Sequence, residues 1–424
     1  MQSLSFLRER NRNRVSSFPK MPFLPYGRQY IDEDDITAVT EALQSEYLTT
    51  GPFIESFERA FAEAVGAEFA VVSNSGTAAL HIAAAAAGIG PGDGVIVPTV
   101  TFLATANAIR YLGAEVVFAD VDPRSGLLTE EYLKEALHRL KKAGLKAKAV
   151  LPVHLNGPSI DMVGIQSIAE KEGLRIIEDA CHALGSKQIT GNGSVESVGA
   201  CTLSDFACFS LHPVKTITMG EGGVTTTKDA DMARKMATMR SHGMVRDPAK
   251  ILNRNLGFDS FGVANPWYYE MHEPGFNYRA TDFACALGIS QLKKLENFSI
   301  RRKALAALYD RLLLPLAPIV RPASRLSPDI AVLHLYAVQI DFASLGRTRS
   351  QVMQWLRDRG IGTMVHYIPV HYQPYYVQRY GELALPGAEA YYSRQLSIPF
   401  YPAMTDDDVS RVVDALTELV QNKA

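Results

Sequence analysis

The sequence predicts an α/β protein. We expect a mainly parallel central sheet with helices on both faces, plus a smaller C-terminal α+β domain. Between residues 69 and 178, short apolar runs alternate with helical patterns, which is typical of strands joined by crossover helices. Those runs are continuous rather than alternating, as in strands buried on both faces. After about residue 285 this rhythm ends, and long helical patterns with isolated strands follow. The change of pattern predicts a second domain.

The N-terminal part predicts an extension followed by two helices. Residues 1–24 carry Arg8, Arg10, Arg12 and Arg14 but no apolar periodicity, so we expect a flexible, solvated extension, with a nucleic-acid-binding arm as the alternative. A helix is expected to begin after Asp32, a favourable N-cap. Turn residues at 48–52 precede a helix over 53–65, in which phenylalanine recurs at helical spacing.

The alternating region predicts five strands and their crossover helices. Each strand is a short run rich in Val, Ile or Phe, and each helix follows turn chemistry. The expected strands are 69–73, 94–98, 115–119, 147–153 and 174–178, and the expected helices are 78–90, 102–111 and 162–172.

The C-terminal part predicts longer helices and two strands. We expect a helix over 284–314 with a break near Phe298, strands at 333–340 and 363–367, and helices at 349–359 and 406–420, the last capped by Thr405. The expected organisation is an extension (1–24), a large α/β domain (25–285) and a small α+β domain (286–424).

Composition excludes several classes of protein. A net charge of −2 gives no electrostatic footprint for nucleic acid or for an acidic membrane surface. No run approaches the roughly 18 apolar residues of a membrane span. The four cysteines have no paired CxxC spacing. They are therefore expected to be reduced thiols of a cytoplasmic protein, and no metal site is expected.

Lys215 and Asp179 together indicate chemistry based on pyridoxal 5′-phosphate (PLP). Lys215 stands in a loop of hydroxyl residues and glycines, and Asp179 ends an apolar run. A lysine amine can form a Schiff base with the cofactor aldehyde, and a buried carboxylate can keep the pyridine nitrogen protonated. Taken alone, Lys215 fits an ordinary surface lysine and Asp179 fits a helix cap. The PLP hypothesis therefore rests on the pair.

Several other residues are candidates for holding such a cofactor. Ser75-Gly76-Thr77 follows a predicted strand and opens a predicted helix, so it offers free N–H groups to a phosphate. Ser210 can add a hydroxyl. Phe102 can cover the ring, and His182 can lie near it, although a core aromatic and a structural histidine are comparable alternatives for these two.

The motifs in combination resemble the DegT-type family of sugar-nucleotide aminotransferases, over about residues 25–402. They comprise SGTAAL at 75–80, PTVTF at 98–102, EDACH at 178–182, the lysine loop, GFNYR at 275–279, HY at 366–367 with PVH at 369–371, and LSIP at 396–399. The resemblance implies the aspartate-aminotransferase-like fold (PLP fold type I) and PLP as cofactor. A related dehydratase branch has histidine where this chain has Lys215.

Carried over by this resemblance, Lys215 forms the Schiff base and moves the proton, while Asp179 pairs with the pyridine nitrogen. The residues expected to contact the cofactor are Gly76, Thr77, Phe102, Asp179, His182, Ser210, Lys215 and Asn277. Asn277 is expected to reach the neighbouring subunit's cofactor, which implies a homodimer with shared active sites. Thr49, Tyr278 and His366 are expected to line the substrate pocket.

Local strings are similar to the family branch that serves pseudaminic acid synthesis. They include PYGRQYI at 25–31, LTTGP at 48–52 and HPVK at 212–215. The expected reaction moves an amino group from L-glutamate to the C4 ketone of a UDP-linked 4-keto-6-deoxy-N-acetylhexosamine. Its product would be UDP-4-amino-4,6-dideoxy-N-acetyl-β-L-altrosamine. Alternatives are another nucleotide-sugar C4 aminotransferase such as a GDP-perosamine synthase, a non-catalytic PLP-binding regulator, and an α/β enzyme without PLP in which Lys215 is incidental.

Overall fold

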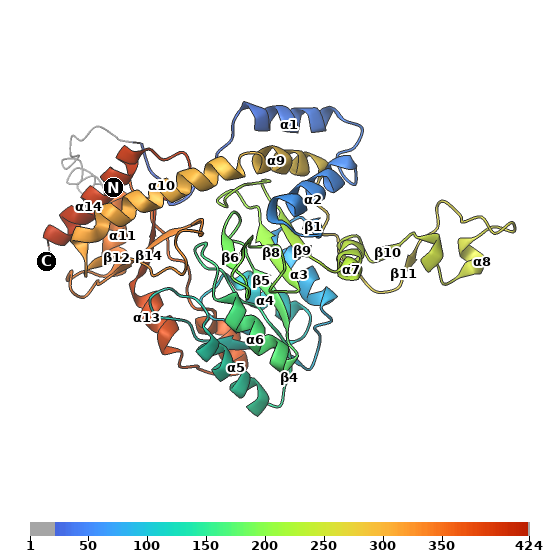
Figure 1. The fold of residues 1–424 in the computed structure, drawn as a ribbon, viewed down its shortest axis with the longest axis horizontal. Helices are drawn as coiled ribbons and strands as arrows, with labels where there is room; N and C mark the ends of the chain where they lie inside the picture. The colour runs from blue at the N-terminus through green and yellow to red at the C-terminus, as the bar shows by residue number, and fades with distance from the viewer. Residues whose placement is uncertain (1–21, 423–424) are drawn as a thin grey trace, which may run out of the picture.

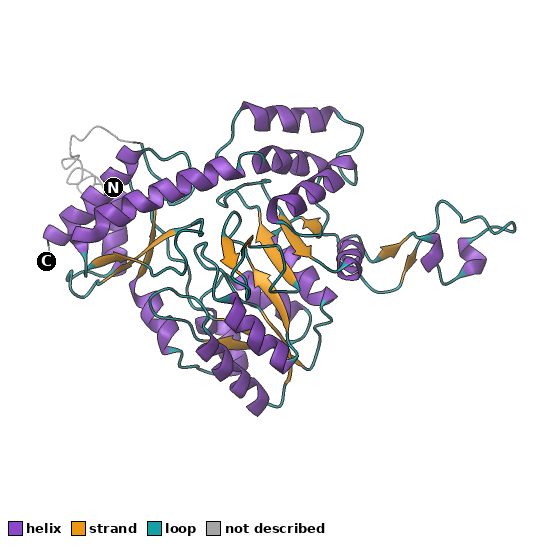
Figure 2. Ribbon diagram, viewed as in Figure 1, coloured by secondary structure: helices purple, strands orange, loops and turns teal. Residues whose placement is uncertain are grey.

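A seven-stranded sheet forms the centre of the molecule (Figures 1 and 2), in the order β1-β9-β8-β5-β4-β2-β3. The structure is a computed structural model and describes residues 22–422. The strands are β1 (Phe69–Ser73), β2 (Asp93–Pro98), β3 (Glu115–Ala119), β4 (Lys146–Val150), β5 (Arg175–Asp179), β8 (Phe206–Ser210) and β9 (Gly223–Thr227). Neighbours from β8 to β3 are parallel, and β9 is antiparallel to both its neighbours. All strands except β9 therefore run one way, and their C-terminal ends share one edge. This confirms the mainly parallel α/β fold.

Helices cover both faces of this sheet, as its continuous apolar strands require. Alternate side chains of a strand point to opposite faces. Val71 of β1 packs in the core cluster that contains α3, whereas Val72 packs with Phe57 and Phe61 of α2. The α-helices of the chain from residue 22 to residue 292 are α1 (Glu33–Gln44), α2 (Pro52–Val65), α3 (Gly76–Ala86), α4 (Leu103–Tyr111), α5 (Glu130–Lys142), α6 (Met162–Glu172), α7 (Ala230–Arg240), α8 (Arg254–Gly257) and α9 (Asp282–Leu292).

The C-terminal part builds its own small sheet and apolar core. Strands β12 (Val320–Pro322), β13 (Tyr336–Ile340) and β14 (Gln395–Ile398) are antiparallel. The helices are α10 (Leu295–Leu313), α11 (Arg349–Asp358), α12 (Pro374–Tyr380), α13 (Pro386–Arg394) and α14 (Asp406–Gln421). Thr405 caps α14, as predicted. Within residues 22–422, no helix has both the length and the apolar character needed to cross a membrane.

Four details of the sequence-based prediction were wrong. The long helix breaks at residues 293–294 rather than near Phe298, because α9 packs on α1 and α2 while α10 runs into the C-terminal part (Figure 1). Residues 363–367 form only an isolated bridge from Met364 to Ser397, since the His366 N–H donates to the Gln395 side chain instead. Strand β4 ends at Val150 rather than at 153.

The fourth correction concerns the N-terminal extension. Residues 1–21 lie outside the described part, and so does the Arg-rich segment. Leu24, however, is buried and forms a bridge with Ile361. Residues 22–24 therefore belong to the folded body. Strands β8 and β9, which bracket the lysine loop, and the small hairpin β6 (Lys187–Ile189) and β7 (Val195–Ser197) were not predicted.

One segment projects from the body as an arm, which we define as residues 244–271 (Figures 1 and 2). It contains the short strands β10 (Met244–Val245) and β11 (Glu270–Met271), which pair, and helix α8 at its outer part. Its surface carries large apolar side chains: Leu252 is 77 % exposed, Phe261 89 % and Trp267 73 %. Such a concentration of exposed apolar residues is typical of an interaction surface.

Candidate active site

A cavity of about 720 Å³ lies at the edge of the sheet where the parallel strands end. Its lining comes from the turn before α3, the end of β5, the loop after β8, and the segments around His334 and His366. Ligands of parallel α/β sheets bind at this edge, because the loops that follow the strands converge there. The volume is in the usual range for small-molecule sites.

Lys215 projects into this cavity from the loop between β8 and β9. The loop is closed by its own hydrogen bonds, one from the Lys215 N–H to the His212 carbonyl at 2.8 Å. Burial lowers the pKa of the Lys215 ammonium, and the nearby Cys181 and Asp179 partly offset this effect. A lysine with a lowered pKa has a larger neutral, nucleophilic fraction.

Asp179 stands at the end of β5 and is held by two donors. Oδ2 accepts a hydrogen bond from the Thr105 hydroxyl at 2.6 Å, and Oδ1 accepts one from the Cys181 N–H at 3.2 Å. The residue is 5 % exposed and lines the cavity. Its carboxylate is thus fixed in orientation, with burial that strengthens any ion pair it makes.

The N-terminus of α3 forms one end of the cavity. Ser75 caps the helix by accepting from the Ala78 N–H at 3.1 Å. The N–H groups of Gly76 and Thr77 have no partner within the described residues, as is normal for the first turn of a helix. A Cβ at Gly76 would lie 2.8 Å from the Ser210 Cβ, so only glycine lets β8 approach this turn. The site presents N–H and hydroxyl donors where a phosphate group would fit.

His182 is fixed by hydrogen bonds at both ring nitrogens. Nδ1 accepts from the Asn156 N–H at 3.2 Å, and Nε2 lies 3.1 Å from the Tyr367 hydroxyl. Burial lowers the pKa of His182 well below its ordinary value, so the ring is neutral and Nε2 carries the proton. The Tyr367 oxygen therefore accepts a hydrogen bond from His182 Nε2. The O–H of Tyr367 is then free to donate into the cavity.

His366 also lines the cavity, and its contact with the substrate stays a prediction. Its Nδ1 lies 2.9 Å from the Ser397 hydroxyl, and its ring lies 5.3 Å from that of Tyr26. Burial, and then the charge of Lys215, lower the pKa of His366 to about 3. Phe102 lines the cavity too and is 56 % exposed.

Three predicted residues lie outside the cavity of their own chain. Thr49 is exposed and forms a bridge with Thr281. Asn277 is exposed at the base of the arm. The Tyr278 hydroxyl lies 3.0 Å from His81 Nδ1. For these residues, contact with a cofactor or substrate stays a prediction that requires a second copy of the chain.

Sequence reasoning missed several residues that line or support the cavity: Tyr26, Cys181 as a cavity residue, His334, Tyr367, and Thr105 behind Asp179. Tyr26 lies in the PYGRQYI string and Tyr367 in the HY motif. Their membership of these family motifs was the one sign that they could belong to the site. For Thr105 and His334 the sequence held no such sign, because helical and strand spacing do not reveal which side chain faces a residue far away in the sequence.

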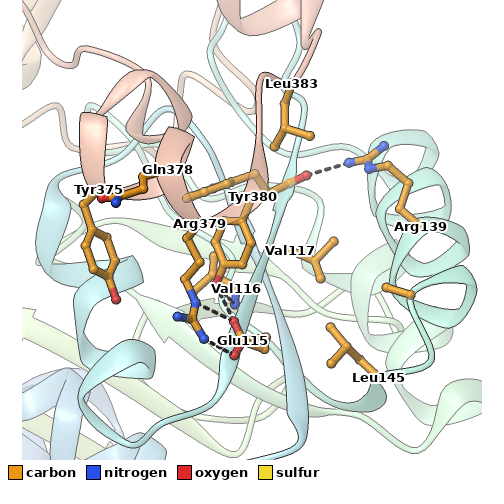
Figure 3. Close-up of a pocket in the computed structure, with 12 residues that line it drawn as sticks. Glu115, Val116, Val117, Arg139, Leu145, Tyr375, Gln378, Arg379, Tyr380 and Leu383 are labelled. Carbon is orange, nitrogen blue, oxygen red and sulfur yellow. Dashed lines mark hydrogen bonds and ion pairs between the residues drawn. The ribbon is translucent and has the colours of Figure 1, made fainter.

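A second cavity, of about 780 Å³, lies along the edge strand β3, between α5 and α12 (Figure 3). Its charged groups already have partners, and Arg139 donates to the Phe118 main-chain carbonyl at 2.5 Å. Glu115 accepts from Arg379 and Tyr380, and these contacts, the Arg379 hydrogen bond above all, lower the pKa of Glu115 to about 2. Such saturated groups offer little to a ligand.

Comparison with known proteins agrees with this geometry. The model of the DegT/DnrJ/EryC1/StrS aminotransferase family matches residues 29–417. The chain belongs to this family. It is 38 % identical over 402 residues to the spore coat polysaccharide biosynthesis protein SpsC of Bacillus subtilis (strain 168), covering 94 % of this chain and 97 % of SpsC.

Solved structures match as well. Helicobacter pylori PseC, an aminotransferase involved in the biosynthesis of pseudoaminic acid, superposes with a TM-score of 0.81 at 27 % identity, over 94 % of this chain and 99 % of PseC. The PLP form of the putative sugar aminotransferase Spr1654 from Streptococcus pneumoniae gives 0.81 at 25 % identity, over 95 % of this chain and all (100 %) of that one. The chain is thus a PLP-dependent sugar aminotransferase with the PLP fold type I architecture.

The residues present fit this cofactor. The unpartnered donors of the α3 N-terminus suit a phosphate, the buried Asp179 suits a protonated pyridine nitrogen, and Lys215 reaches the same cavity. The four cysteines are free thiols, as predicted.

Proposed function

We propose that this aminotransferase moves the amino group of L-glutamate to the C4 ketone of a UDP-linked 4-keto-6-deoxy-N-acetylhexosamine. The product is then UDP-4-amino-4,6-dideoxy-N-acetyl-β-L-altrosamine. The observation that carries amino transfer is the meeting of Lys215, Asp179 and the α3 N-terminus in one cavity. The observation that favours this sugar is the match to PseC over 94 % of the chain.

Each residue has a defined task in this proposal. Bound PLP supplies an aldehyde that takes up an amino group and a ring that withdraws electrons from the neighbouring carbon. Gly76, Thr77 and Ser210 hold its phosphate, and Asp179 keeps the ring nitrogen protonated. Lys215 removes and returns the proton at the substrate carbon, since its lowered pKa favours the neutral amine.

Phe102 and His182 complete the proposed cofactor site. The exposed ring of Phe102 covers one face of the cofactor. His182 acts through Tyr367, because its Nε2 proton is already donated to the Tyr367 oxygen. His366 lies where it can contact the sugar substrate.

We further propose that the chain works as a homodimer with shared active sites. The exposed apolar side chains of the arm would be covered by a second copy, and Asn277 at the base of the arm would reach the phosphate of the partner's cofactor. Thr49 and Tyr278, which lie outside their own cavity, would then help to form the partner's substrate pocket.

The relation to SpsC supports a second candidate. SpsC is named for spore coat polysaccharide biosynthesis, and it is 38 % identical to this chain, compared with 27 % for PseC. The alternative is therefore amino transfer to a different nucleotide-linked keto sugar.

A product assay separates these candidates. The holoenzyme is incubated with L-glutamate and, in turn, the UDP-, GDP- and dTDP-linked 4-keto-6-deoxy sugars, and each product is identified by NMR. The proposal expects kcat/KM for the UDP-linked N-acetyl sugar to exceed the others by at least about tenfold. A higher kcat/KM for a sugar on another nucleotide would favour the second candidate.

A lysine variant tests amino transfer itself. Lys215→Ala should bind PLP without the visible absorption band of the lysine-linked cofactor and should turn over no sugar. Lys228→Ala, which changes a lysine outside the cavity, is the control. Full turnover by Lys215→Ala would refute the role of this lysine.

A further inference from the structure

His334 is a buried histidine of the cavity whose ring has no hydrogen-bond partner among residues 22–422. It is 3 % exposed and lines the cavity. Neither ring nitrogen is bonded to any of residues 22–422, and Nδ1 is fully enclosed. His182 uses both of its nitrogens, and His366 uses Nδ1. Since a buried polar group without a partner is unfavourable, His334 is suited to receive a ligand.

A buried cation lies directly behind His334. Arg302 of α10 is 1 % exposed, and no carboxylate within the described chain pairs with it. Its Nη1 donates to the main-chain carbonyls of His334, at 3.1 Å, and Leu333, at 3.3 Å. Burial lowers the pKa of Arg302 to about 10, which still leaves it charged at neutral pH. An uncompensated charge in such surroundings attracts an anion strongly.

The titratable groups that act most on the pKa of His334, besides Arg302, are Lys215 in the lysine loop, His182 after β5, and His366 before β14. The carboxylates of Asp179 and Glu221 line the same cavity. Burial first, and then these neighbours and Arg302, lower the pKa of His334 well below its ordinary value. The ring is therefore neutral in the free protein, and the standing positive charge that acts on it is that of Arg302.

The other anions of the reaction narrow the choice of ligand. His334 is only 3 % exposed, so a ligand can reach it only through the small part of the ring that faces the cavity. The cofactor phosphate has its own donors at the α3 N-terminus. The remaining anion that must enter this cavity in the proposed function is a carboxylate of the amino donor.

We propose that His334 binds a carboxylate of L-glutamate and takes up a proton from solvent as the carboxylate enters. The carboxylate stays ionised. The N–H bond that the proton forms with the imidazole breaks again when the donor is released, so the only change is a reversible proton transfer between solvent and His334. The inference rests on glutamate as the donor in the proposed function. It makes His334, supported by Arg302, a determinant of donor specificity rather than of sugar specificity.

Calorimetry with an unreactive dicarboxylate tests this inference. Glutarate is titrated into the holoenzyme at pH 7.5 in two buffers of different ionisation enthalpy, and UDP is titrated as the second ligand. We expect the wild type to take up as much as about one proton per glutarate. The visible band of the cofactor reports any protonation at Lys215 separately.

The decisive comparison is His334→Gln, which keeps a neutral donor but cannot take up the proton. The glutarate Kd should rise about 10- to 100-fold, as expected for loss of a hydrogen bond between charged groups, and the proton uptake should vanish. His371→Gln is the matched control, because His371 is similarly buried, at 2 %, but lies outside the cavity. A UDP Kd equal to that of the wild type shows that the variant is folded.

Two results would overturn the inference. One is the same glutarate Kd and proton uptake in His334→Gln as in the wild type, and the other is a loss of UDP affinity with glutarate binding intact. If the His334→Gln variant does not fold, the pH dependence of glutarate binding to the wild type still tests the inference. Its glutarate affinity should weaken as the pH rises from 6.5 to 8.5, and a flat profile would contradict protonation of His334.

A separate measurement distinguishes failure of the proposed function from failure of the His334 inference. L-Glutamate added to the wild type without sugar should change the visible spectrum of the cofactor. If it does not, glutamate is not the donor, whereas a His334-dependent affinity for glutarate would still establish a carboxylate site.

Discussion

The Thr105 hydroxyl lies 2.6 Å from Oδ2 of Asp179 and joins the first turn of α4 to the end of β5. The Thr101 hydroxyl lies 2.7 Å from that of Thr105, which can therefore accept from Thr101 while it donates to the carboxylate. Asp179 is thus oriented by the protein itself, before any ligand binds.

Removing this donor should weaken cofactor binding. Thr105→Val keeps the shape of the side chain but leaves Oδ2 without its partner. Because a hydrogen bond to a charged group contributes about 1.5–3 kcal/mol, we expect the PLP Kd to rise about 10- to 100-fold. Titration of the apoenzyme with PLP, followed by absorbance, measures this change. Thr238→Val, whose hydroxyl donates to the Arg234 carbonyl on the exposed side of α7, should leave the Kd unchanged. An equal Kd for Thr105→Val would exclude a role in holding Asp179.

The buried pair next to Asp179 should matter for stability. His154 Nε2 lies 2.6 Å from Glu178 Oε2, and both side chains are fully buried. Loss of one partner of a buried pair typically costs about 3–5 kcal/mol, so His154→Ala should lower the free energy of unfolding by about that amount. Urea denaturation measures it. The exposed Lys134–Glu130 pair provides the contrast, since Lys134→Ala should cost less than about 1 kcal/mol. Comparable losses in both variants would contradict this expectation.

The cofactor-free protein should lose stability in mild acid. The pKa values of His182, His334 and His366 are lowered in the folded state, in each case chiefly by burial. The unfolded chain takes up protons at the ordinary histidine value of about 6.5. Below that pH the unfolded state therefore binds more protons, and the free energy of unfolding falls as the pH falls.

The contribution of His366 can be isolated, because its pKa is about 3 in the folded protein. Between pH 7.5 and 5.5 it should account for about 1.4 kcal/mol of the loss. His366→Asn should remove that part of the pH dependence in urea titrations at the two pH values. The exposed His138 on α5 supplies the control variant His138→Gln. An unchanged slope in His366→Asn would show that this imidazole does not resist protonation.

Shared active sites predict complementation between inactive subunits. Lys215→Ala should be inactive and Asn277→Ala impaired. In a mixed dimer one site would carry both substitutions and the other neither. If subunits exchange freely in an equal mixture, about one quarter of the wild-type activity should appear. Activity that never exceeds the average of the two separate variants would contradict the contribution of Asn277 to the partner's site.

Local patterns were sufficient for much of the fold and for the centre of the site. The alternation of apolar runs and helical periodicity predicted β1 to β5 and the helices α3, α4 and α6, although not α5, because each depends on the side chains of one continuous segment. The pairing of Lys215 with Asp179 followed from the hydroxyl residues and glycines around the lysine and from the place of the carboxylate at the end of an apolar run. Strands β8 and β9 escaped prediction, since the pattern around them was dominated by the glycines and hydroxyl residues of the lysine loop.

The sequence by itself therefore determined the α/β class, the order of the main elements and the lysine and carboxylate of the chemistry. Only the tertiary structure decided which partners those groups have. Thr105 and Asp179 are 74 residues apart, Tyr367 and His182 are 185 apart, and Arg302 reaches the carbonyl of His334 across 32. Periodicity describes which face of its own element a side chain occupies. The orientation of one element against another depends on the packing of the whole core. That packing fixed the tautomer of His182 and left the ring of His334, beside a buried arginine, without a hydrogen-bond partner in the described part of the chain.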